Sequence, residues 1–590
     1  MKKVWPILMV LVPAMLLSVF STSFAADASP PGGGGPVGPG GGPGGPGGAT
    51  ISARIKIADG VRDTSGELAD SKAKLTIDKS GGVNGTSATG IKIETSTAGY
   101  SGVSVSGSND FTLGGPNDLY TVDGTGYNSV IKLDDSDVAT TTKNYGSELA
   151  AGIGYSVKGG TAYLDNSYIY TVGSGRPATY AGSKGTMIVR DSYVEARGGA
   201  SSFIPGFKLI YGSCRVNMTS GGTSFFFNSK VKSNDWGALS TDTGGPDPTY
   251  LYAYNTYAES TNGGYGTYSD TNCFVYLYGS TLKAGEFGAI LSNSGELYAD
   301  SGANASSIVK EKMDSRDKTT TEGSAIIGAR NAVMVHTVDS MQNADSAALT
   351  FKAKLNVKNS TLSTVTDLKS AGDYVNDKKV GASAPFINHH LGSVILFRSG
   401  NADVSLDNCK MTSSNGALIH SVPDYDEGGA VYPIDCNEAL GINVSLKNMD
   451  LKGNILHEDY QRKMHLSLSG AGIAGKIVSG TMTAWNSLWS GYSNDIQKAL
   501  IHNTGYKSVW GLTMTMDAGS KWIVTDTSSL AGLTVEKGAS ITAESGKTLK
   551  IYRDCKMDNN KAFYDYSTGA EITALEPGKT YAGVVLVISR

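Results

Sequence analysis

The sequence predicts an all-β protein whose short strands wind into a solenoid, and three observations carry this prediction. Apolar and polar residues alternate with a period of two in most segments after residue 49, for example in ARIKIAD (53–59), GIKIETS (90–96) and GTMIVRD (185–191). Gly, Asn, Asp and Ser interrupt these runs every few residues, and the chain contains 76 glycines. One short pattern, an Asn-Ser or related pair between two alternating runs, also recurs many times. A helical period is nearly absent, and NDIQKAL (494–500) is the main exception.

The recurring pattern begins with TAYLDNSYIY (161–170). It returns in MIVRDSYVEA (187–196), FFFNSKVKS (225–233), YAYNTYAES (252–260), VYLYGSTLKA (275–284), LNVKNSTLST (355–364), VSLDNCKMTS (404–413) and VSLKNMDLKG (444–453). Several copies are about 25 residues apart, whereas a propeller would repeat at about 40–45 residues. Larger gaps predict protruding loops or further turns. We therefore expect stacked parallel strands, with roughly eighteen to twenty turns between residues 50 and 545.

Two columns of apolar residues flank the aligned pairs. The column two residues before the Asn position contains Leu164, Val189, Phe226, Ala253, Leu277, Val357, Leu406 and Leu446. The column two residues after the Ser position contains Ile169, Val194, Val231, Ala258, Leu282, Leu362, Met411 and Leu451. Both columns are predicted to lie in file inside the solenoid, because alternate residues of a strand point to opposite faces. The Asn or Asp between the runs is predicted to turn a corner with left-handed backbone, and stacked amides can hydrogen-bond along the axis.

These features resemble the right-handed parallel β-helix of pectin-lyase-like proteins. The corner Asn of that architecture matches Asn166, Asn228, Asn255, Asn359, Asn408 and Asn448. Near the C-terminus, the segment 511–551 resembles the end of autotransporter passenger domains and related secreted adhesins. The matching residues are Trp522, Val524, Thr525, Ser529, Leu530, Leu533, Thr534, Gly538, Ala539 and Ile541. The resemblance implies a single-stranded right-handed β-helix over residues 50–550. Residues 551–590 are expected to form a cap where an autotransporter would continue into its membrane barrel.

The first 49 residues are expected to lie outside the folded body. A short basic start, an apolar run and the small residues of Ser23-Phe24-Ala25 predict a signal peptide over residues 1–25, cleaved after Ala25. Residues 26–49 are mostly Gly and Pro, which predicts a flexible linker. The mature chain is therefore expected to be extracellular or at the cell surface. No later apolar run reaches the length of a membrane span.

Charge and cysteine content exclude several classes of protein. The 50 basic and 54 acidic residues are mixed and give a net charge of −4, which argues against a nucleic-acid partner. The five cysteines do not suggest a disulfide scaffold. Cys409 and Cys436 lie about one repeat apart, so either a disulfide or isolated buried thiols would fit. The seven histidines show no HxxxH spacing, and neither a metal nor another cofactor is expected.

The clearest surface signal is aromatic. If Phe226, Ala253 and Leu277 point inward, their neighbours point outward, namely Phe225, Phe227, Tyr252, Tyr254, Tyr276 and Tyr278. Tyr250 and Phe274 extend the same rows. An exposed block of rings would suit sugar faces or an apolar patch of a protein partner. The alternative is that the rings are covered, either by a loop, for which 232–248 is the obvious candidate, or by the N-terminal segment. Residues 310–318 and 367–379 are expected to be solvated insertions.

The expected function is display by a non-enzymatic, adhesin-like protein that binds a glycan or a surface protein of another cell. One alternative is a polysaccharide lyase or glycoside hydrolase, since one fold can host both activities. The acidic clusters at 134–137 and 424–427 could supply paired carboxylates, but turn residues explain them better. A second alternative is a structural subunit of a surface layer or filament, for which the purified chain would self-associate.

Overall fold

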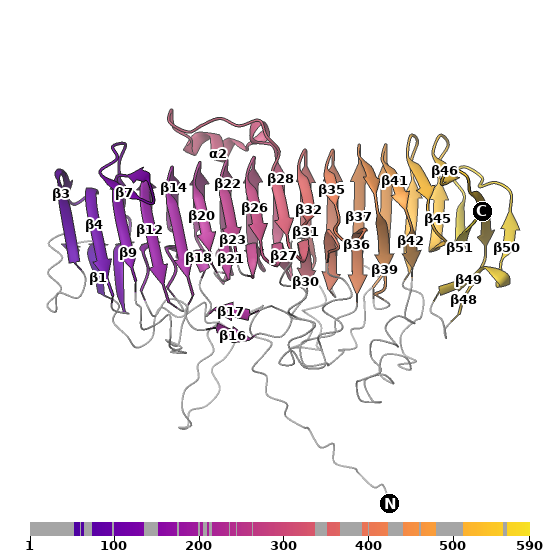
Figure 1. Ribbon diagram of the computed structural model, residues 1–590, viewed down its shortest axis with the longest axis horizontal. Helices are drawn as coiled ribbons and strands as arrows, with labels where there is room; N and C mark the ends of the chain where they lie inside the picture. The colour runs from indigo at the N-terminus through magenta and orange to yellow at the C-terminus, as the bar shows by residue number, and fades with distance from the viewer. Residues whose placement is uncertain are drawn as a thin grey trace, which may run out of the picture.

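The computed structural model describes residues 52–58, 61–63, 74–96, 99–134, 152–173, 176–198, 201–203, 209–211, 215–234, 236–243, 245–261, 263–336, 351–365, 392–398, 400–422, 441–459, 462–479, 511–558 and 563–590. These residues form a long rod of stacked turns, with the earliest strands at one end and the latest at the other (Figure 1). Strands of successive turns pair in parallel, so the chain is a single-stranded parallel β-helix, as the sequence predicts. The signal peptide, the linker and the expected helix at 494–500 lie outside the described residues.

Each turn contributes one strand to each of three parallel sheets. The first sheet contains the start of β4 (Ser87–Thr95), β6 (Asp110–Gly114), β11 (Thr161–Asp165), β14 (Thr186–Arg190), β19 (Thr223–Phe227), β22 (Thr249–Tyr254), β25 (Cys273–Tyr278), β28 (Glu296–Asp300), β31 (Ala353–Lys358), β34 (Ala402–Asp407), β37 (Ile442–Lys447), β40 (Met464–Ser469), β43 (Leu512–Met516) and the second half of β45 (Ser528–Val535).

The second sheet follows the first in every turn. It contains β4 (Ser87–Thr95), β9 (Ser129–Leu133), β12 (Ser167–Val172), β15 (Tyr193–Arg197), β20 (Lys230–Ser233), β23 (Tyr257–Ser260), β26 (Thr281–Ala284), β29 (Ala325–Gly328), β32 (Thr361–Thr364) and β35 (Lys410–Thr412). A separate ladder continues it through β38 (Asp450–Lys452), β41 (Gly472–Gly475), β44 (Lys521–Val524) and β46 (Ser540–Ala543).

The third sheet closes each turn. It contains β1 (Ser52–Ala58), β5 (Tyr100–Ser106), β10 (Tyr155–Lys158), β13 (Thr179–Gly182), β18 (Arg215–Ser220), β21 (Gly237–Asp242), β24 (Tyr265–Ser269), β27 (Phe287–Ser292), β30 (Asn331–His336), β33 (Ile395–Arg398), β36 (Ala417–Val422), β39 (Asn454–His457), β42 (Ile477–Ser479) and the first half of β45.

The predicted core file is confirmed. Leu164 pairs with Val189, Val189 with Phe226, Phe226 with Ala253, and Ala253 with Leu277 in the register of the first sheet. All five side chains belong to one continuous core and are at most 1% exposed. Burial of each large aliphatic or aromatic side chain contributes roughly 1.5–3 kcal/mol, so the file is a main source of the stability of the rod.

The corner between the first and second sheets has the predicted left-handed backbone. Asn166, Asn228 and Asn408 have φ values of 44°, 49° and 52°. The expected amide ladder is partial. Nδ2 of Asn255 donates to Oδ1 of Asn228 at 2.7 Å and Nδ2 of Asn408 donates to Oδ1 of Asn359 at 2.8 Å, whereas other corner amides bond to aspartates.

A hydroxyl ladder runs beside the corner amides. The backbone N–H of Ser280 donates to Oγ of Ser324 at 3.2 Å, and the N–H of Ser324 donates to Oγ of Ser360 at 3.1 Å. The hydroxyl of Ser324 in turn donates to the carbonyl of Asp300 at 2.8 Å. At the corner the chain leaves the regular strand pairing, so these backbone N–H groups have no carbonyl partner in the sheets. The ladder of hydroxyls accepts their hydrogen bonds, which buried N–H groups need. It explains why Ser or Thr follows the corner residue in so many turns.

The predicted number of turns is too high. The first sheet holds fourteen strands over the described residues, counting the start of β4, fewer than the eighteen to twenty turns expected. The difference arises because long insertions separate some turns. The insertion between β28 and β29, residues 301–324, contains η1 (Gly302–Asn304) and α2 (Ser307–Lys312). None of the helices in the described ranges is long and apolar enough to cross a membrane.

Antiparallel strands flank the parallel stack at both ends. At the N-terminal end β2 (Val61–Asp63) pairs with β1, and β3 (Lys74–Val83) pairs with β4. At the C-terminal end β51 (Thr580–Ser589) pairs with β45 and with β47 (Thr548–Arg553), which also pairs with β50 (Ala570–Ile572). The remaining elements are the hairpins β7 (Tyr120–Val122)–β8 (Thr125–Tyr127), β16 (Ser201–Phe203)–β17 (Leu209–Tyr211) and β48 (Lys556–Asp558)–β49 (Phe563–Asp565), and η6 (Tyr566–Thr568).

Candidate functional site: an aromatic face under a strap

The outer face of the first sheet carries aligned rows of rings between β19 and β28. The middle row runs from Phe225 through Tyr252 and Tyr276 to Tyr298, each in register with the next. Phe227, Tyr254 and Tyr278 form the row nearer the corner, and Tyr250 and Phe274 form the row on the other side. We call these nine residues the aromatic face. Their outward direction follows from the inward direction of Phe226, Ala253 and Leu277, as predicted.

The rings of the middle row stack face to face along the rod. Centroids are 4.8 Å apart from Phe225 to Tyr252, from Tyr252 to Tyr276 and from Tyr276 to Tyr298, with interplanar angles of 10°, 11° and 8°. This spacing is the distance between neighbouring strands. The faces of the inner rings are therefore occupied by one another. What the row can offer to a ligand is ring edges and phenol hydroxyls, which differs from the expected platform for sugar faces.

Most of the predicted binding residues are covered. Phe225, Phe227, Tyr252, Tyr254 and Tyr278 are buried, and Tyr276 is half-buried. Five of the six rings are therefore not exposed, which agrees with the alternative that another segment of the chain covers the block. The cover is the insertion 301–324, which we call the strap, and not the 232–248 loop. The segment 310–318, expected to be a solvated insertion, is part of this cover, and the strap that contains α2 lies along the edge of the rod above β14 to β28 (Figure 1).

The strap presents three apolar side chains to the rings. Ala305, Val309 and Met313 are spaced by four residues and pack against the cluster of Ile188, Phe225, Phe227, Tyr252, Tyr254 and Tyr278. Val309 is fully buried. The backbone N–H of Thr320 also donates to the hydroxyl of Tyr254 at 3.0 Å. Only Val309 lies in α2; Ala305 comes before the helix and Met313 caps its C-terminal end, and both have extended backbone. All three side chains nevertheless face the rings.

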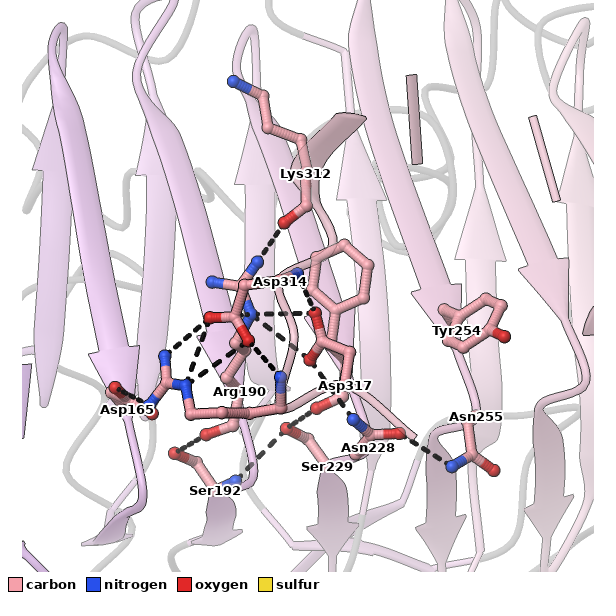
Figure 2. A network of polar contacts seen from close by, with 12 residues as sticks. Asp165, Arg190, Ser192, Asn228, Ser229, Tyr254, Asn255, Lys312, Asp314 and Asp317 are labelled. Carbon is pink, nitrogen blue, oxygen red and sulfur yellow. Dashed lines mark hydrogen bonds and ion pairs between the residues drawn. The ribbon is translucent and has the colours of Figure 1, made fainter. Parts of the chain in front are cut away.

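A buried ion pair holds the far end of the strap. Nε of Arg190, on β14, lies 3.2 and 3.0 Å from the two carboxylate oxygens of Asp317, whose side chain is fully buried. The guanidinium also donates to the carbonyl of Lys312 and stacks over the ring of Phe227 at 4.9 Å. Figure 2 shows Arg190 at the centre of this network. Removal of Arg190 would leave the buried carboxylate of Asp317 without its cation. Removal of Asp317 would leave the Arg190 guanidinium only the longer ion pair to the half-buried Asp314, at 3.5 Å.

Other charged groups surround this pair (Figure 2). Arg316 binds Asp314 and Asp165, with N–O distances of 2.6 Å to each carboxylate. The Arg316 guanidinium lowers the pKa of Asp314. Burial, and then the neighbouring carboxylates of Asp317 and Asp165, raise the pKa of Asp191. The two arginines therefore share the carboxylates of Asp165, Asp314 and Asp317, and the nearby carboxylate of Asp191 lies in an unfavourable environment.

We expect the substitution Asp191→Asn to raise the free energy of unfolding by up to about 1 kcal/mol at pH 7. Asp191 has the left-handed corner conformation, with φ of 46°, that Asn166 and Asn228 adopt in adjacent turns. A raised pKa in the folded state means that the native protein loses stability as pH rises through that pKa. The amide removes this loss. The gain should therefore vanish below about pH 3.9, where the carboxyl is neutral in the unfolded chain too.

Urea unfolding at both pH values measures this difference. The control is Asp123→Asn, at an exposed turn residue with φ of 48°, which should change stability by no more than about 0.5 kcal/mol. Equal effects of the two variants would show that left-handed backbone alone, and not carboxylate crowding under the strap, accounts for the gain.

One margin of the aromatic face is left partly uncovered. Tyr250, Phe274, Tyr276 and Tyr298 are half-buried, and we call them the tyrosine strip. Burial and the neighbouring Tyr298 raise the pKa of Tyr276 to about 12, so its hydroxyl is protonated at neutral pH. Tyr298 donates to Glu296, and Nζ of Lys354 lies 6.0 Å from its ring centroid. Tyr298 was missed from the sequence because no Asn-Ser pair follows it directly.

A second group of polar residues in the core is less suited to binding. Oγ of Ser421 lies 2.5 Å from Nδ1 of His457, and Nε2 of that histidine lies 3.0 Å from the carbonyl of Arg462. Ser421 is in register with Phe397, which belongs to the core, and both Ser421 and His457 are at most 1% exposed. The pair therefore lies inside the rod, where it stabilises a turn.

The other expectations concern metals and thiols. Over the described ranges no group of three or more His, Cys, Asp or Glu side chains is placed to hold a metal ion. Cys273, Cys409 and Cys555 are buried free thiols, and burial raises the pKa of Cys409 to about 11. Several of the predicted features lie outside the described residues: Cys214, Cys436, residues 135–137, the cluster at 424–427 and the insertion at 367–379.

Comparison with protein-family models, curated proteins and solved structures found no match for this chain.

Proposed function

We propose that the protein is an exported, adhesin-like rod that binds a glycan or protein partner without transforming it. In this proposal the signal peptide directs export, and the fold is the right-handed, pectin-lyase-like form of the β-helix that the corner asparagines resemble. The tyrosine strip is the contact surface. The supporting observation is the register of these rings over consecutive turns of a rigid parallel sheet, with their edges only half-buried.

The strip offers a defined chemistry. Its ring faces are used in stacking, so the groups left for a ligand are apolar edges and the hydroxyls of Tyr250 and Tyr276, while the hydroxyl of Tyr298 already donates to Glu296. Amphipathic rings of this kind suit a partner that is apolar on one side and hydrogen-bonding on the other. Glu296 and Lys354 mark the charged end of the strip, with an N–O distance of 3.5 Å.

The pairing at the C-terminal end disfavours growth of a filament through two of the three sheets. β51 pairs along both halves of β45, which supplies the last described strand of the first and third sheets. An edge strand that is already paired cannot template another chain. Self-association through the ends is therefore a weaker proposal than binding along the side of the rod.

The test is a pair of variants on the same sheet face. Tyr250→Ala, Tyr276→Ala and Tyr298→Ala are combined in one chain, and Ser405→Ala, Ser445→Ala and Ser467→Ala in the control. The serines occupy the same outward row further along the rod. Purified proteins are applied to glycan arrays, to cultured cells and to soluble polysaccharides.

We expect the tyrosine variant to lose at least tenfold in affinity for any ligand bound by the native chain, about 1.4 kcal/mol, and the serine variant to keep it. Unchanged binding by a folded tyrosine variant would remove the strip from the proposal. Release of shortened polysaccharide would instead favour the enzyme alternative, and concentration-dependent assembly of the native chain would favour the structural one.

A further inference from the structure

The strap covers a surface that could also bind a similar segment from another protein molecule. We infer that the covered part of the aromatic face is a docking surface for a protein segment that carries apolar residues at every fourth position and a carboxylate four residues after the last. The strap is the resident occupant of this surface and competes with any segment supplied by another molecule. The inference rests on the proposed function only in placing the docking surface beside the tyrosine strip.

The first argument is the spacing of the residues that touch the surface. Ala305, Val309 and Met313 meet the rings, and Asp317 meets Arg190, so contacts recur at intervals of four residues. The apolar contacts come from one turn of helix at Val309 and from the extended residues on either side of it, Ala305 and Met313. The carboxylate of Asp317 then fixes the direction and register of the segment, as apolar anchors with a charged contact do in recognition of short peptide segments. The pattern of residues that fits this surface can therefore be stated from the sequence of the strap.

The second argument is that the rod does not need the strap to turn its corner. In other turns one or two residues connect the first and second sheets, for example Asn166 alone, or a pair that begins with Asn228 or Gly279. In the strap turn, the N–H of Gly302 donates to the carbonyl of Glu322 at 2.9 Å and closes the insertion at its base. Ser324 then takes the usual place in the hydroxyl ladder, and its hydroxyl bonds to the carbonyl of Asp300 as Ser167 bonds to Asp165, both at 2.8 Å.

The third argument is that the attachment of the strap is imperfect. The hydroxyl of Ser306 and Oδ1 of Asp165 are buried without a hydrogen-bond partner among the described residues. Ile308, on the outer side of α2, is 40% exposed. A six-residue helix is not stable by itself, so the strap is ordered only while it is docked. A better-matched segment could therefore replace it.

The fourth argument concerns the surface beneath. Three of the covered rings, Tyr252, Tyr254 and Tyr278, carry hydroxyls, so the surface can be wetted when the strap leaves. This differs from the interior file of Leu164 to Leu277, which has no polar atoms on its side chains. Tethering gives the strap an effective concentration in the millimolar range. A segment from another molecule must therefore bind more tightly than the strap does, or bind after the strap has detached.

The test uses a shortened chain and a peptide. The shortened chain replaces residues 301–323 with a single asparagine, which recreates the order Asp-Asn-Ser found at 165–167. The probe is a fluorescent synthetic peptide of residues 301–324. We expect the shortened chain to bind the peptide saturably and the native chain to bind it at least tenfold more weakly. A peptide with Asp317→Asn, or a shortened chain with Arg190→Gln, should also lose at least tenfold.

Other results would overturn the inference. A folded shortened chain that shows no saturable binding, or that binds both peptides equally, would show that the aromatic face does not recognise a strap-like segment. If the shortened chain fails to fold, the full-length variant Val309→Ser takes its place and should bind the peptide more tightly than the native chain does. Neither result changes the outcome for the tyrosine strip, because Tyr250, Tyr276 and Tyr298 are tested with other ligands. Dimers of the shortened chain with the native chain would identify a second copy as the partner.

Discussion

Replacing Trp522 with alanine is expected to lower the free energy of unfolding by about 3–5 kcal/mol. The indole is fully buried inside the last turns of the rod, where β44 pairs with β41 on one side and β46 on the other. It lies in file between Ile473 and Ile541, and its Nε1–H donates to the carbonyl of Gly475 at 3.0 Å. Alanine would leave both a cavity and a buried carbonyl without its donor.

The adjacent residue provides the control. Ile523 follows Trp522 in the same strand, points to the opposite face and is 40% exposed. Ile523→Ala should change stability by no more than about 0.5 kcal/mol. Circular dichroism during urea unfolding measures both variants, with the transition midpoint as the readout, because a long repeat array need not unfold in two states. Similar losses for the two variants would contradict the inward and outward assignment of this strand.

The fold could be predicted from the sequence because its information is local and repeated. A period of two fixes which side chains of each strand face inward, and the corner residue fixes where the strand ends. Once Leu164 and Val189 are aligned through their corner pairs, the register of neighbouring turns follows. The same alignment correctly sent Phe225 and Tyr252 outward. None of these steps requires knowledge of contacts between residues far apart in the sequence.

The strap could not be predicted in the same way. Its sequence contains no repeat of the rod, and its charged segment 310–318 has the composition of a solvated loop. Its anchor, Arg190, lies 127 residues before Asp317 and belongs to a corner that otherwise fits the pattern. Outward direction and exposure are separate properties, and only the first is encoded by the period of two. The burial of Phe225 and Tyr254 therefore depends on a segment whose docking site the local pattern does not specify.

The second large effect is expected at Arg190 and Asp317. Asp317→Asn or Arg190→Met alone should cost roughly 3–5 kcal/mol of strap attachment, because each removes the buried ionic partner of the other side chain. Global unfolding should show a smaller loss than this, because the strap can detach while the rod stays folded. Once the strap is detached, further weakening of its attachment no longer changes the free energy of unfolding of the rod. Its opening should instead appear as faster trypsin cleavage after Lys310, Lys312 and Lys318, which are exposed. A weakening of about 3 kcal/mol corresponds to roughly a hundredfold in the open population.

The double variant separates the ion pair from the remainder of the interface. If the two side chains act mainly on each other, Arg190→Met with Asp317→Asn should cost less than the sum of the single variants, by about 0.5–3 kcal/mol. Strict additivity would mean that Arg190 and Asp317 hold the strap through other contacts and not through each other. Those contacts are the ring of Phe227 beneath Arg190, and Asn228, whose Nδ2 donates to Asp317 at 3.2 Å. Cleavage rates that stay at the native value in all three variants would show that the apolar contacts of Val309 are sufficient to keep the aromatic face closed.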